Sequence, residues 1–564
     1  MKTTRHLPLL ALCYLAAHFC LAGCSTGSAS QPPPTPPPSI RSFAASATSI
    51  MAGQTVTLDW SVTGATTIEL SGVSAVGGNS VVVTPAETIT YTLTATNSSG
   101  SVSQPLTITV EQGAALGSAT VDATKPGTQI QPSFLGFSHE WSGPPVLMGQ
   151  PGNTNPIYRQ LVKNLAAYAG GPLLIRIGGN STDTTGVPTT GVVAPMAQLY
   201  TDLGAKFTLG VNLGSDEVAL ATQQAQYYVA NMSAGSLEAI EIGNEPDLYH
   251  DNGDRPPTYT FADYFSDFAT WRAAILPLLP QGVKLMGPSW ASTGSLSNLP
   301  AFLSEEEQNL SIVSQHYYAG TQCNGNTNPP DYLLQDSAAT KGATAVASSV
   351  TLTHQAGLPF RMGEMNSISC GGETGVSDIF ASSLWSTDVM FEFANVGVDG
   401  VNFHNGNGGG YALFQFNTAI MGNTTTYSIE SIRPEYYGLL FFQMATANTP
   451  KLLPVTLGTK ASLKVWATID GNGVVHVVLI NKDEAAQGVV SISLPAYGNG
   501  TVARLIASSY QATTGITLGG QTFDGSTDGT PQGMAYTETV APNGGVYSVA
   551  VGPTSAALLT LNPQ

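Results

Sequence analysis

The chain is short of charge, and above all of positive charge. Only 10% of its 564 residues are Asp, Glu, Lys or Arg, against about 25% in an average soluble protein. Nineteen basic residues face 37 acidic ones, which gives a formal net charge of −18. Binding to nucleic acid or to anionic lipid depends on Lys and Arg. The composition therefore excludes nucleic acid as a partner and provides no basic surface for anionic lipid.

Long apolar runs are confined to the start of the chain. Lys2 and Arg5 precede an apolar stretch from Leu7 to Phe19, which is too short to span a bilayer and is typical of a signal peptide. No other segment reaches 18 uninterrupted apolar residues, so we expect the remainder of the chain to be soluble.

The segment Leu21-Ala-Gly-Cys-Ser25 resembles the lipobox of bacterial lipoproteins. The resemblance implies that residues 1–23 are removed, and that Cys24 is acylated and anchors the exported chain to a bacterial membrane on its periplasmic or outer face. An ordinary secretory signal with an incidental cysteine is the alternative. Residues 24–38 contain Pro-Pro-Pro-Thr-Pro-Pro-Pro and predict an extended linker behind the anchor.

Two regions show the alternating pattern of β-strands. Residues 39–111 carry short strands separated by turns, for example Val56–Trp60, and resemble bacterial immunoglobulin-like modules without a cysteine pair. We expect this module to act as a spacer or weak adhesion module. Residues 450–564 predict a second β-sandwich, which a strand from 118–131 could join.

Residues 118–445 alternate predicted strands with predicted helices, which is typical of a (β/α)8 TIM barrel. The expected strands are 133–140, 173–180, 206–214, 237–244, 284–290, 311–318, 359–366 and 398–405. The expected helices are 157–169, 217–232, 261–278, 333–354, 377–395 and 432–445. The predicted fold class is multidomain, α/β and all-β, with a barrel between two β-sandwiches.

Two of the expected strands end in glutamate. Glu245 lies in Ile240-Glu-Ile-Gly-Asn-Glu-Pro-Asp247, and Glu364 lies in Phe360-Arg-Met-Gly-Glu-Met-Asn366. The carboxyl ends of TIM-barrel strands carry the active site. Glycoside cleavage needs one carboxylic acid to protonate the leaving oxygen and a second carboxylate as nucleophile or base. A barrel-mouth ion pair is the alternative for either residue alone, but the two together favour a glycosidase.

At these residues the chain resembles the retaining clan A glycoside hydrolases. The segments 241–247, 314–318 and 363–367 are most similar to family 79, which contains β-glucuronidases and heparanases and joins a barrel to a C-terminal β-sandwich. The resemblance spans about 118–564. It implies that Glu245 is the acid/base, that Glu364 is the nucleophile and that Asn244 contacts the sugar 2-hydroxyl.

The resemblance also implies that the loop after the eighth strand holds a uronate carboxylate. The matching residues here are 405–411, so Tyr411 and the backbone of Gly409 and Gly410 are candidates. A pocket selective for uronate would be expected to provide Arg or Lys, yet no basic residue ends a strand. Hydroxyl and backbone donors would therefore have to suffice.

An ionised nucleophile needs hydrogen-bond donors or cations nearby. We expect Tyr317 or Tyr318, together with Arg176, to supply them to Glu364. Further strand-end residues are candidates for sugar contacts, with core packing or a structural hydrogen bond as the alternative for each. They are Trp290, which could stack on a sugar face, and His139, Glu140, Asn180 and His404, which could bind hydroxyls.

Cysteine is scarce, and this gives a structural prediction. Cys13 and Cys20 leave with the signal and Cys24 is lipidated, so that Cys323 and Cys370 remain. Because they follow neighbouring barrel strands in an oxidising compartment, we expect a disulfide, with free buried thiols as the alternative. No cysteine or histidine has metal-ligand spacing, so we expect no metal and no cofactor.

Together these patterns predict an exo-acting, retaining β-glycosidase. The preferred substrate is a β-glucuronide or a glucuronate-terminated oligosaccharide. A neutral-sugar β-glycosidase of the same clan is one alternative. A non-catalytic, carbohydrate-binding surface lipoprotein is another, although the two glutamates argue against it.

Overall fold

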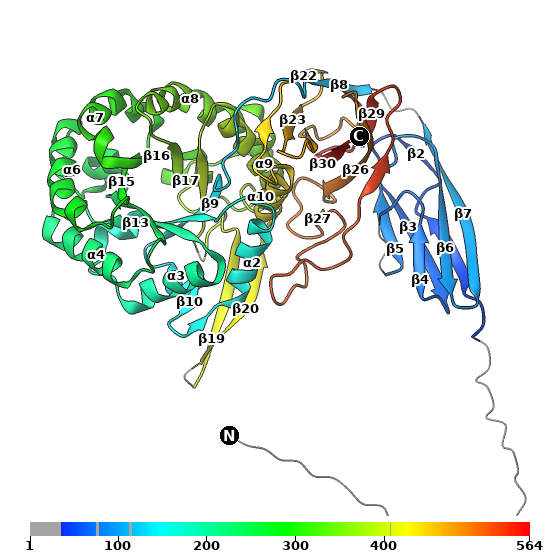
Figure 1. Cartoon of the computed structure of the whole chain (residues 1–564), viewed down its shortest axis with the longest axis horizontal. Helices are drawn as coiled ribbons and strands as arrows, with labels where there is room; N and C mark the ends of the chain where they lie inside the picture. The colour runs from blue at the N-terminus through cyan, green and yellow to red at the C-terminus, as the bar shows by residue number, and fades with distance from the viewer. Residues whose placement is uncertain (1–34, 75–77, 112–114, 407, 423) are drawn as a thin grey trace, which may run out of the picture.

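The computed structural model describes residues 35–74, 78–111, 115–406, 408–422 and 424–564. The expected signal peptide, the lipid attachment at Cys24 and most of the proline-rich linker lie outside the described residues. Figure 1 shows three bodies in a row: a barrel, a sheet-rich domain beside it, and an N-terminal β-module at the far side of that domain. Within the described ranges, no helix is both long and apolar enough to cross a membrane.

Eight parallel strands close into a barrel, in chain order around the ring, which confirms the predicted fold class. The strands are β9 (Leu135–Glu140), β12 (Leu174–Gly178), β13 (Lys206–Val211), β14 (Leu237–Ile242), β15 (Lys284–Trp290), β16 (Leu310–Thr321), β17 (Phe360–Ser369) and β18 (Gly400–His404). All eight correspond to predicted strands. Their nearly unbroken burial explains their continuous apolar runs, since both faces of a parallel barrel strand are covered.

Eight helices of at least eight residues accompany the strands in the described chain. They are α2 (Pro156–Ala166), α3 (Thr190–Leu203), α4 (Val218–Asn231), α6 (Phe261–Ile275), α7 (Leu299–Glu306), α8 (Asp336–Gln355), α9 (Ala381–Asn395) and α10 (Pro434–Ala445). Two of them, α3 and α7, were not predicted. Helix α3 contains Pro195, which normally argues against a helix interior, and α7 is only eight residues long.

An antiparallel hairpin, also not predicted, separates the eighth strand from α10. It pairs β19 (Phe414–Met421) with β20 (Thr424–Ile432) and projects from the barrel in Figure 1. The hairpin begins directly after the predicted uronate-binding loop. Its base is buried at Phe414 and Phe416, so the core anchors the chain that leaves this loop.

The C-terminal domain consists of two sheets. One has the order β21-β23-β24-β30-β26-β27, with β28 also paired to β26, and the other has the order β22-β8-β25-β29. The strands are β8 (Ala115–Val121), β21 (Lys451–Leu452), β22 (Val455–Thr459), β23 (Leu463–Ile469), β24 (Val475–Asn481), β25 (Gly488–Ser493), β26 (Tyr497–Ile506), β27 (Thr517–Leu518), β28 (Glu538–Val540), β29 (Val546–Val551) and β30 (Ser555–Pro563). Strand β8 precedes the barrel, yet it pairs with β22 and β25. The C-terminal domain is therefore formed by chain segments that come before and after the barrel in the sequence.

The N-terminal module is also built from two sheets, β1-β3-β5 and β2-β7-β6-β4. The strands are β1 (Ser39–Ala45), β2 (Ser49–Met51), β3 (Val56–Thr63), β4 (Thr67–Leu70), β5 (Ser80–Val83), β6 (Ile89–Asn97) and β7 (Gly100–Glu111). The module contacts the C-terminal domain through specific bonds. Arg504 donates to the Thr84 carbonyl at 3.1 Å, and the Tyr536 hydroxyl donates to the Val82 carbonyl. It is therefore docked against its neighbour.

Candidate active site

Glu245 and Glu364 meet at the carboxyl ends of the barrel strands. Glu364 lies within β17 and is 7% exposed, and Glu245 follows β14 with a left-handed backbone (φ 51°, ψ 51°). One oxygen of each carboxylate and one ring nitrogen of His316 all lie within 4.8 Å of one another. Retaining glycosidases hold their two carboxyl groups about 5–5.5 Å apart, whereas inverting enzymes need a wider gap for water. The close approach therefore fits a double-displacement mechanism.

Arg176 on β12 is the centre of the buried network beneath this pair. Its side chain is fully buried, and its Nη1 donates to Glu364 Oε2 at 2.6 Å while its Nε donates to Glu241 Oε2 at 2.7 Å. Its Nη2 donates to Asn244 Oδ1 at 2.8 Å. One guanidinium thus orients the nucleophile candidate and the residue that precedes the acid/base candidate.

The surroundings of Glu364 stabilise its ionised form. Burial by itself raises the pKa of this carboxyl, but attraction to His404, followed by His316 and Arg176, outweighs that effect. The Tyr318 hydroxyl donates to Glu364 Oε1 at 2.7 Å and lowers the pKa further. The net pKa of Glu364 lies well below its ordinary value, as a nucleophile requires.

Glu245 has a different environment, with no guanidinium bonded to it. Its Oε1 lies 3.0 Å from His316 Nδ1, and its backbone N–H donates to the Ser289 carbonyl at 3.1 Å. Ser289 in turn donates through its hydroxyl to Glu241 at 2.5 Å. The two catalytic candidates are therefore held by different partners, although they face the same space.

Asn244 is fixed in orientation by four neighbours. Its Oδ1 accepts from Arg176, and its Nδ2 donates to Asn180 Oδ1 at 2.8 Å. Its backbone N–H is shared between Asp183 Oδ2 at 3.1 Å and the Tyr249 hydroxyl at 3.2 Å. Among the described residues, its amide nitrogen uses one of its two hydrogens, in the bond to Asn180. Asn180, a candidate for sugar contact, thus acts at least as a support for Asn244.

Asp183 is a buried carboxylate that the sequence did not indicate. It accepts from the backbone N–H groups of Leu213 and Gly214, at 2.8 Å each, and from the Tyr249 hydroxyl at 2.8 Å, in addition to Asn244. Burial raises the pKa of Asp183 to about 6 despite these donors. The residue ties together the chain segments that follow three successive barrel strands.

Tyr411, His404 and Glu140 complete the rim near Glu364. The Tyr411 ring centroid lies 5.9 Å from the ring of Tyr318 and 5.9 Å from that of His404. His404 Nδ1 is 3.4 Å from Glu364 Oε2, and His404 Nε2 is 3.7 Å from Glu140 Oε1. These three predicted contact residues are therefore gathered around the nucleophile candidate.

Four other candidates are placed where they cannot contact a sugar as expected. Trp290 is fully buried and packs against Phe261, Tyr264 and Phe302 outside the barrel. Tyr317 points the same way, against Gly342 of α8 and Phe393 of α9. His139 is fully buried, with its ring nitrogens 2.8 Å from the Asn405 carbonyl and the Tyr158 hydroxyl, and burial lowers its pKa to about 4. The Gly410 N–H already donates to the Gly371 carbonyl at 2.6 Å and is not available to a uronate.

The sequence also missed several polar supports of the site. Besides Asp183, Glu241 and Ser289, they are Ser138, which accepts from Arg176 at 3.0 Å, Ser181, whose backbone N–H donates to Glu140 at 3.0 Å, and Arg433, which donates to the Gly409 and Gly410 carbonyls. Glu241 was detectable in principle, since a charged residue inside the apolar strand Leu237–Ile242 requires a buried partner. The others carry no local signal, because their partners come from distant segments.

The expected disulfide between Cys323 and Cys370 is present, with a Cα–Cα distance of 5.5 Å. It joins the chain after β16 to the end of β17. In the described part of the chain, the only group of ionisable residues close enough to share a cation is Glu245, His316 and Glu364. A metal ion there would occupy both catalytic candidates.

The sequence is similar to those of two fungal β-glucuronidases. It is 26% identical over 500 residues to the β-glucuronidase of Aspergillus niger, covering 76% of this chain and 90% of that protein. It is 25% identical over 503 residues to the β-glucuronidase of Neurospora crassa, covering 73% of this chain and 88% of that protein. Residues 465–558 match the glycosyl hydrolase family 79 C-terminal beta domain.

The fold is similar to those of solved glycoside hydrolases. A 4-O-α-L-rhamnosyl-β-D-glucuronidase from Fusarium oxysporum superimposes with a TM-score of 0.63 at 21% identity, over 78% of this chain and 100% of that chain. A family 51 arabinofuranosidase from Xanthomonas axonopodis superimposes with a TM-score of 0.59 at 16% identity, over 79% and 100%. These likenesses establish the arrangement of a barrel with an adjoining sheet-rich domain.

Proposed function

We propose that this chain is a retaining β-glucuronidase of glycoside hydrolase family 79, which removes a terminal β-linked glucuronic acid residue. The observation that carries the proposal is the pair Glu245 and Glu364, with carboxylate oxygens within 4.8 Å of each other at the barrel mouth. The two fungal β-glucuronidases, each matched over nearly nine-tenths or more of its length, support the choice of sugar.

In the first step, the ionised Glu364 attacks the anomeric carbon while Glu245 protonates the departing oxygen. Arg176 and Tyr318 hold one oxygen of Glu364 each, which fixes the carboxylate in the plane from which it attacks. The second amide hydrogen of Asn244 is placed to bond the sugar 2-hydroxyl, an interaction that strengthens in the transition state.

In the second step, water replaces the enzyme at the anomeric carbon. Formation of the glycosyl ester removes the negative charge of Glu364, and Glu245 then accepts a proton from the attacking water. The sugar leaves with the configuration with which it entered. His316, bonded to Glu245 Oε1 at 3.0 Å, keeps this carboxyl aimed at the same point in both steps.

Apart from Arg433, whose guanidinium is bonded to the carbonyls of Gly409 and Gly410, the described part of the site offers a uronate no basic residue besides Arg176. Arg176 is committed to Glu241, Glu364 and Asn244, and within the described part of the site no Lys lies beside the two carboxylates. The neutral hydroxyl of Tyr411 is the donor that fits this role best, with His404 beside it. The same lack of a free cation favours the second candidate, a neutral-sugar β-glycosidase of the same clan.

Paired chromogenic substrates test the proposal. We expect hydrolysis of an aryl β-glucuronide well above that of the β-glucoside with the same aglycone, and ¹H NMR should show the β-anomer as the first product. Glu364→Ala should abolish activity. The matched control is Glu238→Ala, which removes a carboxylate from the amino-terminal end of another barrel strand, β14, where it pairs with Lys206.

The outcomes separate the candidates. Hydrolysis of the glucoside but not of the glucuronide would contradict the uronate assignment and favour the second candidate. A first product with inverted configuration would contradict the roles of both glutamates. If neither glycoside is hydrolysed, yet sugar is bound equally by the parent and by Glu364→Ala, the chain is a carbohydrate-binding protein.

We further propose that the exported chain is anchored to a membrane by lipid on Cys24 and that its N-terminal sandwich is an immunoglobulin-like module between anchor and enzyme. The segment Leu21-Ala-Gly-Cys-Ser25 supports the anchor, and the paired sheets of residues 39–111 support the module. Incorporation of labelled palmitate in a bacterial host, lost in Cys24→Ala, tests the anchor. Release of unlabelled wild-type protein into the soluble fraction would refute it.

A further inference from the structure

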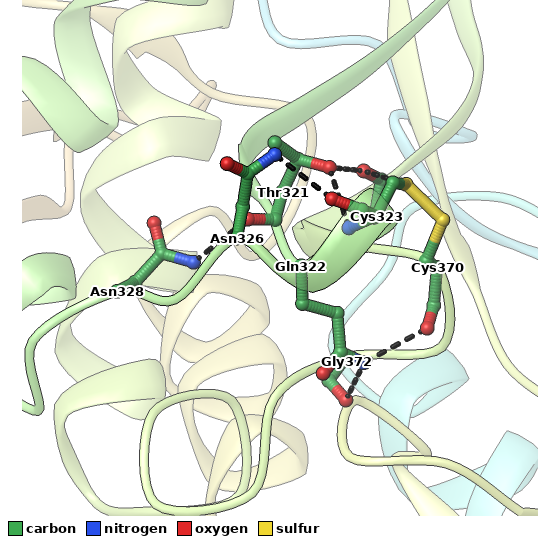
Figure 2. Close-up of a disulfide and its surroundings, with 8 residues drawn as sticks. Thr321, Gln322, Cys323, Asn326, Asn328, Cys370 and Gly372 are labelled. Atoms are coloured by element: carbon green, nitrogen blue, oxygen red, sulfur yellow. Dashed lines mark hydrogen bonds between the residues drawn. A yellow bond between two sulfur atoms is a disulfide. The ribbon is translucent and has the colours of Figure 1, made fainter.

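The disulfide joins the chain just beyond the carboxyl ends of β16 and β17, the strands that carry Tyr318 and Glu364. Figure 2 shows Cys323 and Cys370 with Gln322 and Gly372 beside them. Gln322 Nε2 donates to the Cys370 carbonyl at 2.8 Å and to the Gly372 carbonyl at 2.7 Å. Two independent links therefore run from the end of β16 to the turn that follows β17.

That turn has an unusual backbone. Cys370, Gly371 and Gly372 all have positive φ values, of 62°, 94° and 78°. A left-handed conformation is readily adopted by glycine but disfavoured for cysteine. The turn therefore depends on external links, and the disulfide and Gln322 provide them.

The turn is in direct backbone contact with the loop that carries Tyr411. The Gly410 N–H donates to the Gly371 carbonyl at 2.6 Å. A Cβ added at Gly372 would lie 2.2 Å from the Tyr411 nitrogen, and one at Gly409 would lie 2.4 Å from the Gly371 oxygen. Only glycine permits this approach, and we call Gly371, Gly372, Gly409 and Gly410 the glycine platform.

Arg433 holds the platform from the other side. Its Nη1 donates to the carbonyls of Gly409 and Gly410, at 2.6 Å each, and its Nη2 donates to Gln415 at 2.6 Å. No acidic side chain pairs with Arg433 in the part of the chain that the structure describes. The position of the Tyr411 backbone is thus set by the disulfide-linked turn on one side and by Arg433 on the other.

The side chain of Tyr411 connects the platform to the residues around Glu364. Its ring lies against Tyr318 and His404, and both of these residues approach Glu364. A shift of the platform would therefore move the proposed uronate donor relative to the nucleophile. Glu364 itself is also held by Arg176, which belongs to the buried network beneath the site, and by Tyr318, whose ring contacts Tyr411.

We propose that the Cys323–Cys370 disulfide is a positioning element of the sugar-binding site, which acts through the glycine platform to place Tyr411. The inference rests on the proposed function for the identity of the sugar. It goes beyond that function because it assigns part of the affinity for the sugar to the Cys323–Cys370 disulfide, which does not itself contact the sugar. Because Arg176 holds Glu364 from the buried network, whereas Tyr411 reaches Glu364 only through Tyr318 and His404, loss of the disulfide should weaken binding more than chemistry.

The test compares kcat and KM of four full-length proteins on an aryl β-glucuronide. They are the parent, Cys323→Ser/Cys370→Ser, Gln322→Ala and the control Gln521→Ala. Gln521 also donates to a glycine carbonyl, that of Gly533 at 3.1 Å, but in the C-terminal domain. We expect a KM increase of about tenfold in the cysteine variant and a smaller one in Gln322→Ala, with kcat changed less than threefold and the control unchanged.

A double-mutant cycle identifies the route. In a Tyr411→Phe background, the hydroxyl that the platform positions is absent, so loss of the disulfide should no longer raise KM. Additive effects would overturn the proposal, as would a lower Tm with unchanged KM, which is the signature of a purely structural disulfide. If the cysteine variant does not fold, the folded parent with this disulfide chemically reduced, compared with the oxidised parent, decides by the same criteria.

The parent protein separates this proposal from the proposed function. If the parent hydrolyses the glucuronide and KM does not depend on the disulfide, only the positioning role fails. If the parent hydrolyses another aryl glycoside instead, the glucuronidase assignment fails, and the same cycle run on that glycoside still decides the positioning role. Absence of all hydrolysis would overturn both.

Discussion

Replacing Tyr318 by Phe should raise the pKa of the nucleophile without removing any charge. The Tyr318 hydroxyl donates to Glu364 Oε1 at 2.7 Å. A hydrogen bond to a charged group contributes about 1.5–3 kcal/mol, and one pKa unit corresponds to about 1.36 kcal/mol. The hydroxyl stabilises the ionised form, so its loss favours the protonated form and raises the pKa of Glu364 by about 1–2 units. Activity that needs ionised Glu364 should then fail at a correspondingly higher pH.

A neutral cyclitol epoxide reports this change, because it is opened by an ionised nucleophile and carries no titrating group of its own. The rate of inactivation would be measured from about pH 7 down to the lowest pH at which the protein stays folded. In the parent it should stay high well below pH 4.5, since the pKa of Glu364 lies well below that ordinary value. In Tyr318→Phe, the acidic limb of the pH–rate profile, where the rate of inactivation falls, should move to a higher pH by about 1–2 units.

Tyr317→Phe is the matched control for this experiment. It removes a hydroxyl from the adjacent residue of the same strand, whose ring packs against Gly342 and Phe393 on the outer side. We expect the acidic limb of this variant to coincide with that of the parent. An unmoved limb in Tyr318→Phe, or an equal shift in both variants, would refute the assignment of Tyr318 as a support of the nucleophile.

Three further predictions concern the acid/base, a buried carboxylate and the surface charge. Glu245→Ala should lower kcat by about 10²–10⁴-fold on a glucuronide whose leaving aglycone needs protonation. On a dinitrophenyl glucuronide, whose leaving group needs no proton, the rate of the first step should fall far less. Equal losses in the pre-steady-state rates on the two substrates would contradict the role of Glu245 as the acid. Burial raises the pKa of Asp183 to about 6 from 3.8, so the native state holds this proton more tightly than the unfolded state and stability falls as the pH rises from about 4 to about 6. Asp183→Asn should flatten that part of the Tm–pH curve, and an unchanged slope would contradict the assignment. With a net charge of −18, kcat/KM for an anionic glucuronide should rise as salt is increased from about 10 to about 100 mM; a fall would indicate a basic approach path instead.

The barrel, and the positions of Glu245 and Glu364 at its mouth, could be predicted because both depend on local patterns. All eight strands are largely apolar runs of barrel length; Glu245 follows one of them and Glu364 lies within another. The alternation of side chains along a strand also indicates which of the two tyrosines, Tyr317 or Tyr318, faces the site. His316 and Tyr318 are two residues apart and share the face toward the active site, so Tyr317 had to point outward once His316 was placed inside.

The remaining errors arise where tertiary contacts override local pattern. Trp290 ends a strand whose register shifts between Pro288 and Trp290, which sends Ser289 toward Glu241 and the indole into the outer core. The amide of Gly410 was expected to be free, but its partner Gly371 lies in another loop. Helix α3 forms despite Pro195 because its apolar face, with Val192, Met196 and Leu199, is buried in the core.

The charge around the site explains how an acidic protein could select an anionic sugar. Glu364 and Glu241 share one guanidinium, that of Arg176, and Glu140 lies beside His404, so the mouth has no surplus of positive charge. A second free Arg or Lys would attract a uronate, but it would also pair with Glu364 and compete for the nucleophile. Neutral donors such as Tyr411 avoid that competition, at the cost of needing close alignment, because a hydroxyl bonds only over a short range of distance and angle. A site of this kind depends on rigid support, and the glycine platform with its disulfide-linked turn and Arg433 is the part of the molecule built to supply it.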